Sequence, residues 1–403
     1  MKIGFLLPSV FASTTLFPDR IFAPGQLARD SINGLVHQGH EVYVFSTPDF
    51  VTNGQLIPGD VKPFEKKLVY DKLKRADSFE AKIRNDEVWK RTFEISVTTQ
   101  AYKFTREHHL DIVHAYHDFL FTPHYLEEVT QIPTVYTLHD PLPPEESFEY
   151  HELGKFKDHS YVSISNSQRK SSLSLNFVDT VYHGIDLTAF PFQKQSADYA
   201  LFMGRLVPEK GLHNAIAAAC KINVRLEIGT QLPDILHESE YFKKQIKPFL
   251  SNPLIGEPGI LTGENKITLY KDALALLFPI EWEEPFGIVM IEAMSTGTPV
   301  IAYNRGSVSE IVKDGVTGFI IDPDNQNRPN KGSWIIKEQG VEGLVVAMNR
   351  LNEINRVACR EHVTNHFSVS QMVAGYEKVY QKIIQEYQKK TKDIVYEGSS
   401  RRV

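Results

Sequence analysis

The stretch ALALLFPIEWEEPFGIVMIEAMSTGTPVIAY, residues 273–303, decides how this chain folds. It begins with the apolar run of residues 273–278, passes through a loop that contains Pro285 and Gly287, and continues with the composition of a helix. A second apolar run follows at residues 298–303. A strand, a helix and a second strand in this order form a βαβ unit, which places the two strands parallel in one sheet.

Strand-like and helix-like runs alternate over the rest of the chain as well. The strand-like runs are nearly continuous in apolar and β-branched residues, which is typical of parallel strands with both faces covered. They are residues 2–7, 40–45, 111–115, 133–138, 160–164 and 179–183 in the first half, and 199–204, 223–229 and 318–322 in the second. Helical patterns such as residues 24–38 separate most of them. We therefore predict an α/β fold with two doubly wound domains.

Domain boundaries follow from a change in composition. Residues 183–200 carry Gly, Pro and polar residues with little periodicity, which indicates a hinge. We expect an N-terminal domain at residues 1–185 and a C-terminal domain at residues 186–366. Residues 367–403 contain the pattern of a long amphipathic helix, which we expect to pack back on the N-terminal domain before a frayed end. Two such domains leave a cleft, and ligands of open α/β sheets bind beyond the carboxyl ends of the strands.

The composition argues against several classes of protein. The net charge of −6 and the sequence pI of about 6.2 argue against a nucleic-acid-binding protein held by bulk charge. The two cysteines, Cys220 and Cys359, stand in neither a CxxC nor a CxxH setting, so they predict no zinc site or disulfide framework and favour a cytoplasmic location. No apolar run approaches the roughly 20 residues that a bilayer span needs, and we expect at most peripheral membrane contact.

Two cations follow the strand-like run that ends at Gly204. Arg205 and Lys210 stand beside the predicted start of a helix near Pro208. The free N–H groups and the positive dipole end of a helix favour an anion, and two cations at this point predict a diphosphate site without a metal. The alternative is a pair of surface cations, with Glu209 as their partner.

Two acids frame the helix of the opening stretch. If all eight steps from Glu284 to Glu292 are helical, the two positions are offset by roughly 12 Å along the axis and about 80° around it. Carboxylates accept hydrogen bonds from paired hydroxyls, so one acid could hold a hexose and the other a ribose. The alternative is that Glu292 caps or pairs elsewhere and Glu284 is a loop acid, and for an isolated pair this alternative is favoured.

Several motifs together resemble glycosyltransferase family 4, whose members have the GT-B fold. The most specific is EEPFGIVMIEAMSTGTPVIAYNRGSVSEIVKDGVTGFIID at residues 283–322. The others are GRLVPEKG (204–211), YHGIDLTAF (182–190), FSVSQMVAGYEKVY (367–380), GHEVYVF (39–45), TLHD (137–140) and ISNSQ (164–168). The resemblance implies two Rossmann-like domains that face each other across a cleft, with the nucleotide-sugar donor on the C-terminal domain and the acceptor on the N-terminal one.

The resemblance also implies roles for residues of the C-terminal domain. Glu284 is expected to hold hydroxyls of the donor sugar, and Glu292 to bind the ribose. Backbone N–H groups around Phe286, Gly287 and Ile288 would meet the sugar or the distal phosphate. Arg205 and Lys210 would neutralise the diphosphate leaving group.

Two residues of the N-terminal domain complete the implied site. His139 would lie by the donor sugar and the acceptor, and Gly25 in FAPGQLARD matches a loop that approaches the diphosphate. The family often has two glycines in that loop, and its linker often has Asn where this chain has His183. The alternative for His139 is a structural histidine after a strand.

The implied reaction is retaining transfer of a hexosyl group from a nucleotide-diphosphate sugar to an acceptor hydroxyl, with no cofactor and no metal. UDP-glucose is the expected donor and GDP-mannose the next, whereas the acceptor stays unassigned. A glycoside hydrolase is disfavoured because two helical turns keep Glu284 and Glu292 farther apart than the roughly 5–5.5 Å of a retaining pair. A GT-B phosphorylase, a sugar-nucleotide epimerase and a non-catalytic nucleotide-sugar-binding protein stay open.

Overall fold

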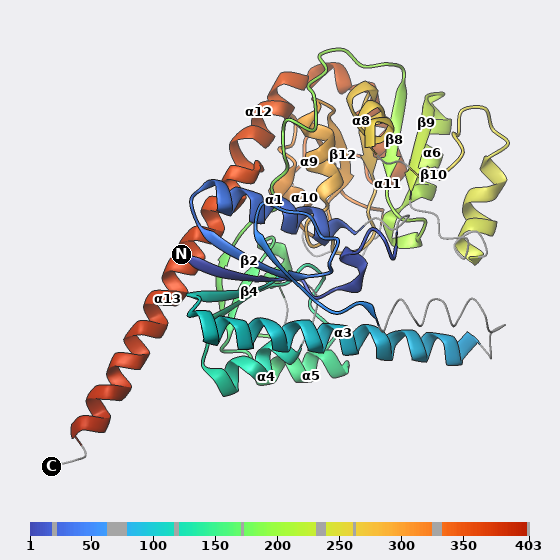
Figure 1. The fold of residues 1–403 in the computed structure, drawn as a ribbon. Coiled ribbons are helices and arrows are strands. Elements are labelled where there is room, and N and C mark those ends of the chain that lie inside the picture. Colours follow the sequence, from blue (N-terminus) through green and yellow to red (C-terminus); the bar gives the residue numbers. More distant parts are fainter. Residues whose placement is uncertain are drawn as a thin grey trace. The chain divides into compact units, whose positions relative to one another are not determined.

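The computed structural model describes residues 1–17, 22–62, 79–116, 121–170, 173–230, 239–260, 263–324 and 333–400. The chain divides into two compact units. Unit 1 consists of Met1–Ile164, Ser171–Val181 and Met372–Val403, and unit 2 of Ser165–Lys170 and Tyr182–Gln371. Each unit is built on a parallel sheet with helices around it (Figure 1). The predicted α/β class with two Rossmann-like domains is confirmed.

The sheet of unit 1 has the strand order β3-β2-β1-β4-β5-β6-β7, and every pairing is parallel. The strands are β1 (Lys2–Leu6), β2 (Glu41–Ser46), β3 (Gln55–Pro58), β4 (Ile112–Tyr116), β5 (Thr134–Thr137), β6 (Ser160–Ser163) and β7 (Phe177–Thr180). Strand β3 lies at the edge of the sheet and was not predicted. It is short and ends in a proline, so its sequence lacks the apolar run that marks the central strands.

Helices cover both faces of this sheet. They are α1 (Ala23–His37), α3 (Phe79–His108), α4 (Phe121–Thr130), α5 (Phe148–Lys155) and α13 (Val369–Ser400), with the short turn η1 (Val10–Ala12) after β1. Alternate residues of β4 point to opposite faces. Val113 and Ala115 belong to the core that contains Val97 of α3, whereas His114 bonds Tyr380 of α13. The long C-terminal helix therefore packs on unit 1 from Met372 onward.

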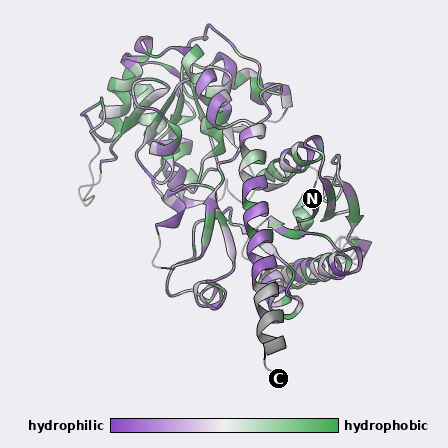
Figure 2. Ribbon diagram, turned by 90° about the vertical axis from the view of Figure 1, so that its left-hand side faces the viewer, coloured by the Kyte–Doolittle hydropathy of each residue, from purple (hydrophilic) through white to green (hydrophobic). Residues whose placement is uncertain are grey.

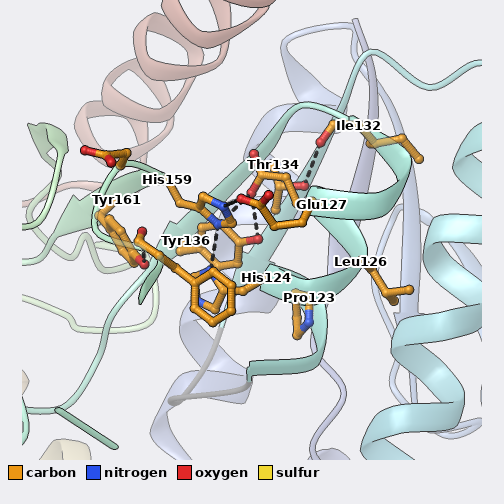
Figure 3. Close-up of polar contacts among 12 residues, drawn as sticks. Pro123, His124, Leu126, Glu127, Ile132, Thr134, Tyr136, His159 and Tyr161 are labelled. Atoms are coloured by element: carbon orange, nitrogen blue, oxygen red, sulfur yellow. Dashed lines mark hydrogen bonds and ion pairs between the residues drawn. The ribbon is translucent and has the colours of Figure 1, made fainter. Parts of the chain in front are cut away.

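A buried polar cluster, shown in Figure 3, lies between α4, β5 and α13 of unit 1. The Glu127 carboxylate accepts hydrogen bonds from the hydroxyls of Tyr136 (2.8 Å) and Tyr387. Nδ1 of His159 lies 3.1 Å from Glu127 and 2.9 Å from Nδ1 of His124. Burial raises the pKa of Glu127, while burial and the neighbouring His159 lower the pKa of His124 well below its usual value. We call these five residues the unit 1 cluster; it fastens α13 to α4.

The sheet of unit 2 has the strand order β10-β9-β8-β11-β12-β13, again with parallel pairing throughout. The strands are β8 (Tyr199–Met203), β9 (Arg225–Thr230), β10 (Gly259–Ile260), β11 (Leu276–Phe278), β12 (Val300–Tyr303) and β13 (Gly318–Ile321). Strand β10 was not predicted, because two residues carry no periodicity. Figure 2 shows hydrophobic residues on the strands and both hydrophobic and hydrophilic residues on the surrounding helices.

The helices of unit 2 follow the strands as the βαβ pattern predicts. They are α6 (Leu212–Ile222), α8 (Gly263–Asp272), α9 (Ile288–Ser295), α10 (Val308–Ile311), α11 (Gly340–Asn349) and α12 (Arg356–His366). Shorter turns are η2 (Ser167–Arg169), η3 (Pro208–Lys210), η4 (Phe242–Ile246), η5 (Lys247–Phe249) and η6 (Leu351–Glu353). Within the described residues, no helix combines the length and the apolar composition that crossing a membrane requires.

Candidate functional site

The loop after β8 carries Arg205 and Lys210, as the sequence predicts. The helix expected near Pro208 begins later, because the turn η3 and Gly211 separate Pro208 from α6. Gly211 has φ 73°, and a Cβ there would lie 1.9 Å from the carbonyl oxygen of Pro279. Only glycine permits this approach, which brings the loop after β8 against the loop after β11.

Lys210 and Glu284 meet where these two loops touch. Nζ of Lys210 donates to Oε2 of Glu284 at 2.5 Å, and each side chain is 12% exposed. Nε1 of Trp282 donates to the same oxygen at 2.7 Å. The Lys210 ammonium also lies 4.9 Å from the centre of the Trp282 ring, within cation–π range. We call Lys210, Trp282 and Glu284 the unit 2 cluster. Arg205, by contrast, is exposed.

The backbone of Glu284 is fixed by the loop after β12. Gly306 has φ 54°, and a Cβ there would lie 2.2 Å from the carbonyl oxygen of Glu284. The N–H of Ser307 donates to that oxygen at 3.0 Å, and its hydroxyl donates to the carbonyl of Phe286 at 2.6 Å. Loops from three neighbouring strands, β8, β11 and β12, therefore converge on Glu284, with Lys210 at its carboxylate and Ser307 at its backbone carbonyl.

Helix α9 begins beside this carboxylate. Its N-cap is Gly287 with φ 77°, and no side chain caps its first turn. Phe286 is buried just before it, and Ile288 is its first residue. Helix-start N–H groups without a side-chain cap are available to donate hydrogen bonds to an anion. The three residues predicted to present backbone N–H groups thus lie at a helix start, next to Lys210 and Glu284 in the fold of unit 2.

Glu292 lies in a separate set of contacts. It is buried on α9, where it accepts from Nζ of Lys266 (2.6 Å) and from the hydroxyl of Tyr270 (2.7 Å), both on α8. Burial and the Glu292 charge raise the pKa of Tyr270 well above its usual value, so this hydroxyl stays a donor. The prediction of eight helical steps between Glu284 and Glu292 was wrong, because α9 begins only at Ile288.

His139 and Gly25 belong to unit 1. His139 follows β5, is half-buried, and packs edge-to-face on Tyr116 with ring centres 4.5 Å apart. Gly25 lies in the first turn of α1, where a Cβ would meet the ring of Phe22 at 2.9 Å. Both follow strands, β5 and β1, as ligand-binding residues of open α/β sheets do.

The linker residue His183, which departs from the usual Asn, is a buried residue of unit 2. Its ring packs on Phe286 with centres 4.8 Å apart, and burial lowers the pKa of His183 to about 3. A neutral imidazole ring therefore packs on Phe286, just before the start of α9.

Sequence reasoning missed Trp282, Lys266, Tyr270 and Ser307. A partly buried indole N–H usually has an acceptor, so Trp282 two residues before Glu284 was a usable signal. Lys266 and Tyr270 stand four residues apart and so share one helix face, but nothing local names Glu292 as their partner. In the described residues, no group of three or more His, Cys, Asp or Glu side chains is arranged to hold a metal.

The segment that carries these residues resembles known proteins. Residues 188–333, which contain Lys210, Glu284 and Glu292, match the family model "Glycosyl transferases group 1". The comparisons support the interpretation of this chain as a glycosyltransferase. The uncharacterised glycosyltransferase MJ1607 of Methanocaldococcus jannaschii is 26% identical over 266 residues, which are 56% of this chain and 64% of that protein. The putative glycosyltransferase YtcC of Bacillus subtilis is 23% identical over 313 residues, 68% of this chain and 73% of that protein.

Solved structures share the fold over nearly the whole chain. The Anabaena protein Alr3699/HepE in complex with UDP-glucose has a TM-score of 0.64 and 17% identity, and the match covers 96% of this chain and 100% of that one. At this identity the likeness shows the fold. It confirms the GT-B fold class with two Rossmann-like domains.

Proposed function

We propose that this protein is a retaining glycosyltransferase of family 4 that moves a hexosyl group from a nucleotide-diphosphate sugar to an acceptor hydroxyl without a metal. The observation that carries the proposal is the Lys210–Glu284 pair. The pair brings together a cation and a carboxylate that can accept hydrogen bonds from sugar hydroxyls. Both residues follow the carboxyl ends of strands, β8 and β11, inside the segment that matches the family model.

The diphosphate is assigned to Arg205, Lys210 and the start of α9. Charge builds on the leaving diphosphate as the glycosidic bond breaks, and fixed positive groups stabilise that charge without reorganising. The Lys210 ammonium has three N–H donors and uses one of them in its hydrogen bond to Glu284. It can therefore contact a phosphate while it keeps the acid. Exposed Arg205 can grip phosphate oxygens with its planar fork.

The two acids receive the two ends of the donor. Glu284 offers Oε1 to sugar hydroxyls, because both of its described donors bind Oε2. Glu292 accepts one hydrogen bond at each oxygen, and each carboxylate oxygen has two lone pairs. Glu292 can therefore accept further hydrogen bonds from ribose hydroxyls. Since each acid has its own cation, a hydrolase pair that shares one reacting centre is disfavoured.

The remaining assignments concern unit 1 and the chemistry. His139 is assigned to the donor sugar and the acceptor, and Gly25 to the approach of the diphosphate. No protein nucleophile is assigned. The leaving phosphate takes the proton of the acceptor hydroxyl on the same face of the sugar, which retains the anomeric configuration. UDP-glucose is the first donor to test, supported by its presence in the HepE complex, and GDP-mannose is the second.

The test is a thermal-shift screen of nucleotide sugars, followed by turnover of a labelled donor with cell extract as the source of acceptor. We expect a donor to raise the unfolding temperature and its label to reach an acceptor. Lys210→Ala should lower transfer by about 100- to 1,000-fold. Lys221→Ala, which removes a cation of α6 paired with Glu342, should not lower it. Binding without turnover would instead indicate a nucleotide-sugar-binding protein. Product that forms only with added phosphate, or an epimerised donor, would indicate a phosphorylase or an epimerase.

A further inference from the structure

Hydrogen bonds fix the backbone of the loop on both sides of Trp282. The N–H of Glu284 donates to the carbonyl of Trp282 at 2.9 Å. On its other side, Glu281 donates its N–H to the carbonyl of Glu209 at 2.8 Å and accepts from the Asn214 side chain at 2.7 Å. The segment on both sides of Trp282 is therefore tied to the loop after β8 and to α6.

The indole bonds one specific oxygen of the acid. Nε1 of Trp282 and Nζ of Lys210 both donate to Oε2 of Glu284, at 2.7 and 2.5 Å. Within the described residues, Oε1 accepts no hydrogen bond. The two donors thus fix the plane of the carboxylate and leave one oxygen for a ligand. A phenyl ring at this position could still contact Lys210, but it has no N–H to donate to Glu284.

The two donors respond differently to a diphosphate. Lys210 is a cation on a flexible stem, and it is attracted to a dianion that arrives beside it. The indole N–H is uncharged and rigid, so its bond to Glu284 does not compete with the phosphate. When Lys210 shares its ammonium donors between Glu284 and the phosphate, the bond from Trp282 to Oε2 stays unchanged.

We propose that Trp282 is a positioning residue, which keeps the Glu284 carboxylate aimed at the donor sugar while Lys210 neutralises the diphosphate. This role rests on the proposed function, since it needs a ligand with a sugar beyond a diphosphate. It predicts that Trp282 contributes to the preference for a nucleotide sugar over the bare nucleoside diphosphate, and not to binding of the diphosphate itself.

The test compares Trp282→Phe with the wild-type chain by calorimetry, using UDP and UDP-glucose, and GDP and GDP-mannose as a second pair. The substitution keeps an aromatic ring beneath Lys210 and removes the N–H together with the rest of the pyrrole part of the indole. A hydrogen bond to a charged group is worth about a 10-fold change in affinity or more. We expect Trp282→Phe to bind the nucleotide sugar about 10-fold more weakly and the nucleoside diphosphate as the wild type does. A merely structural role would weaken both ligands together, and that result would overturn the proposal.

A double-mutant cycle asks whether Trp282 acts through Glu284. In a Glu284→Ala chain there is no carboxylate to orient, so adding Trp282→Phe should change nucleotide-sugar affinity no further. Equal effects of Trp282→Phe in both backgrounds would assign it a role independent of Glu284 and refute the inference. Trp334→Phe is the matched control, because Trp334 donates to Asp322, away from this cluster.

A readout without ligand separates this inference from the proposed function. The chain has three tryptophans, so its indole N–H groups give few NMR signals. The signal lost in Trp282→Phe should shift in Glu284→Ala, and an unshifted signal would mean that the bond does not exist in solution. If that signal shifts but none of the four ligands binds the wild-type chain, the proposed function fails and the positioning role fails with it. If the wild-type chain prefers the nucleotide sugar and Trp282→Phe does so equally, only the role of Trp282 fails.

Discussion

The unit 1 cluster and the unit 2 cluster contain the same kinds of groups in different places. Each has a carboxylate that accepts from an aromatic side chain and faces a basic nitrogen. The unit 1 cluster lies toward the amino ends of its strands, since His159 directly precedes β6 and Glu127 lies on α4, which precedes β5, although Tyr136 belongs to β5 itself. The unit 2 cluster follows the carboxyl ends of β8 and β11. Ligand sites of open α/β sheets lie at the carboxyl ends, which favours a structural role for the first cluster and the proposed ligand-binding role for the second.

The distribution of hydrogen-bond donors over the two carboxylate oxygens supports the same distinction between the clusters. Both oxygens of Glu127 receive hydroxyl donors, from Tyr387 and from Tyr136. Both described donors of Glu284 bind one oxygen. A buried charge with nearby aromatic donors is therefore not enough to identify a site. Two properties distinguish the clusters. One is the position of the cluster along the strands, and the other is whether one carboxylate oxygen has no described donor.

The largest expected effect tests the proposed functional role of the unit 2 cluster. Lys210→Ala should lower turnover by about 100- to 1,000-fold, because one preorganised group opposite the leaving charge is lost. The unfolding temperature should change little, and labelled-donor turnover with thermal melting checks both. Lys221→Ala is the control. Unchanged turnover in Lys210→Ala would remove the proposed diphosphate site.

The unit 1 cluster should respond in the opposite way. Glu127→Ala leaves the buried hydroxyls of Tyr136 and Tyr387 without their acceptor, and we expect a loss of about 3 kcal/mol of unfolding free energy. Turnover per folded molecule should stay the same. Urea denaturation and turnover measure the two effects. Glu128→Ala is the control, because that side chain is 60% exposed where it meets His159. A loss of activity at constant stability would contradict the structural assignment.

Acid should destabilise the face of unit 1 that carries α13. Burial among neutral groups lowers the pKa of His114 to about 3 from its usual 6.5. The unfolded chain takes up the proton first, so this stability is fully present above pH about 6.5 and is lost as the pH falls toward about 3. His114→Gln should reduce the slope of stability against pH in this window by up to about 1.4 kcal/mol per pH unit. Urea denaturation between these pH values checks the slope, and exposed His151→Gln should leave it unchanged.

The smallest expected effect concerns Glu292. Glu292→Ala should weaken binding of a nucleotide sugar about 10-fold, or about 1.4 kcal/mol, through loss of acceptors for the ribose. Lys266→Ala removes the ion-pair partner and leaves the carboxylate, so it should weaken binding less. Calorimetry measures both variants. Equal affinity of Glu292→Ala and the wild type would reject the ribose role.

Much of the fold could be predicted because its signals are local. The helix predicted at residues 24–38 is α1 (Ala23–His37), and the strand predicted at residues 40–45 is β2 (Glu41–Ser46). Buried parallel strands read as apolar runs wherever they occur. The edge strands β3 and β10 escaped prediction because they have only four and two residues, and no residue of β3 is fully buried.

The sequence by itself determined the α/β class, the order of strands and helices, and the presence of Lys210 and Glu284 after strands, since these depend on neighbours along the chain. The tertiary structure decided that Lys210 meets Glu284, that Trp282 holds the same oxygen, and that Glu292 pairs with Lys266 and Tyr270. Such pairings join loops and helices far apart in sequence. They are set by close backbone contacts, such as that of Gly211 with Pro279, which no local pattern contains.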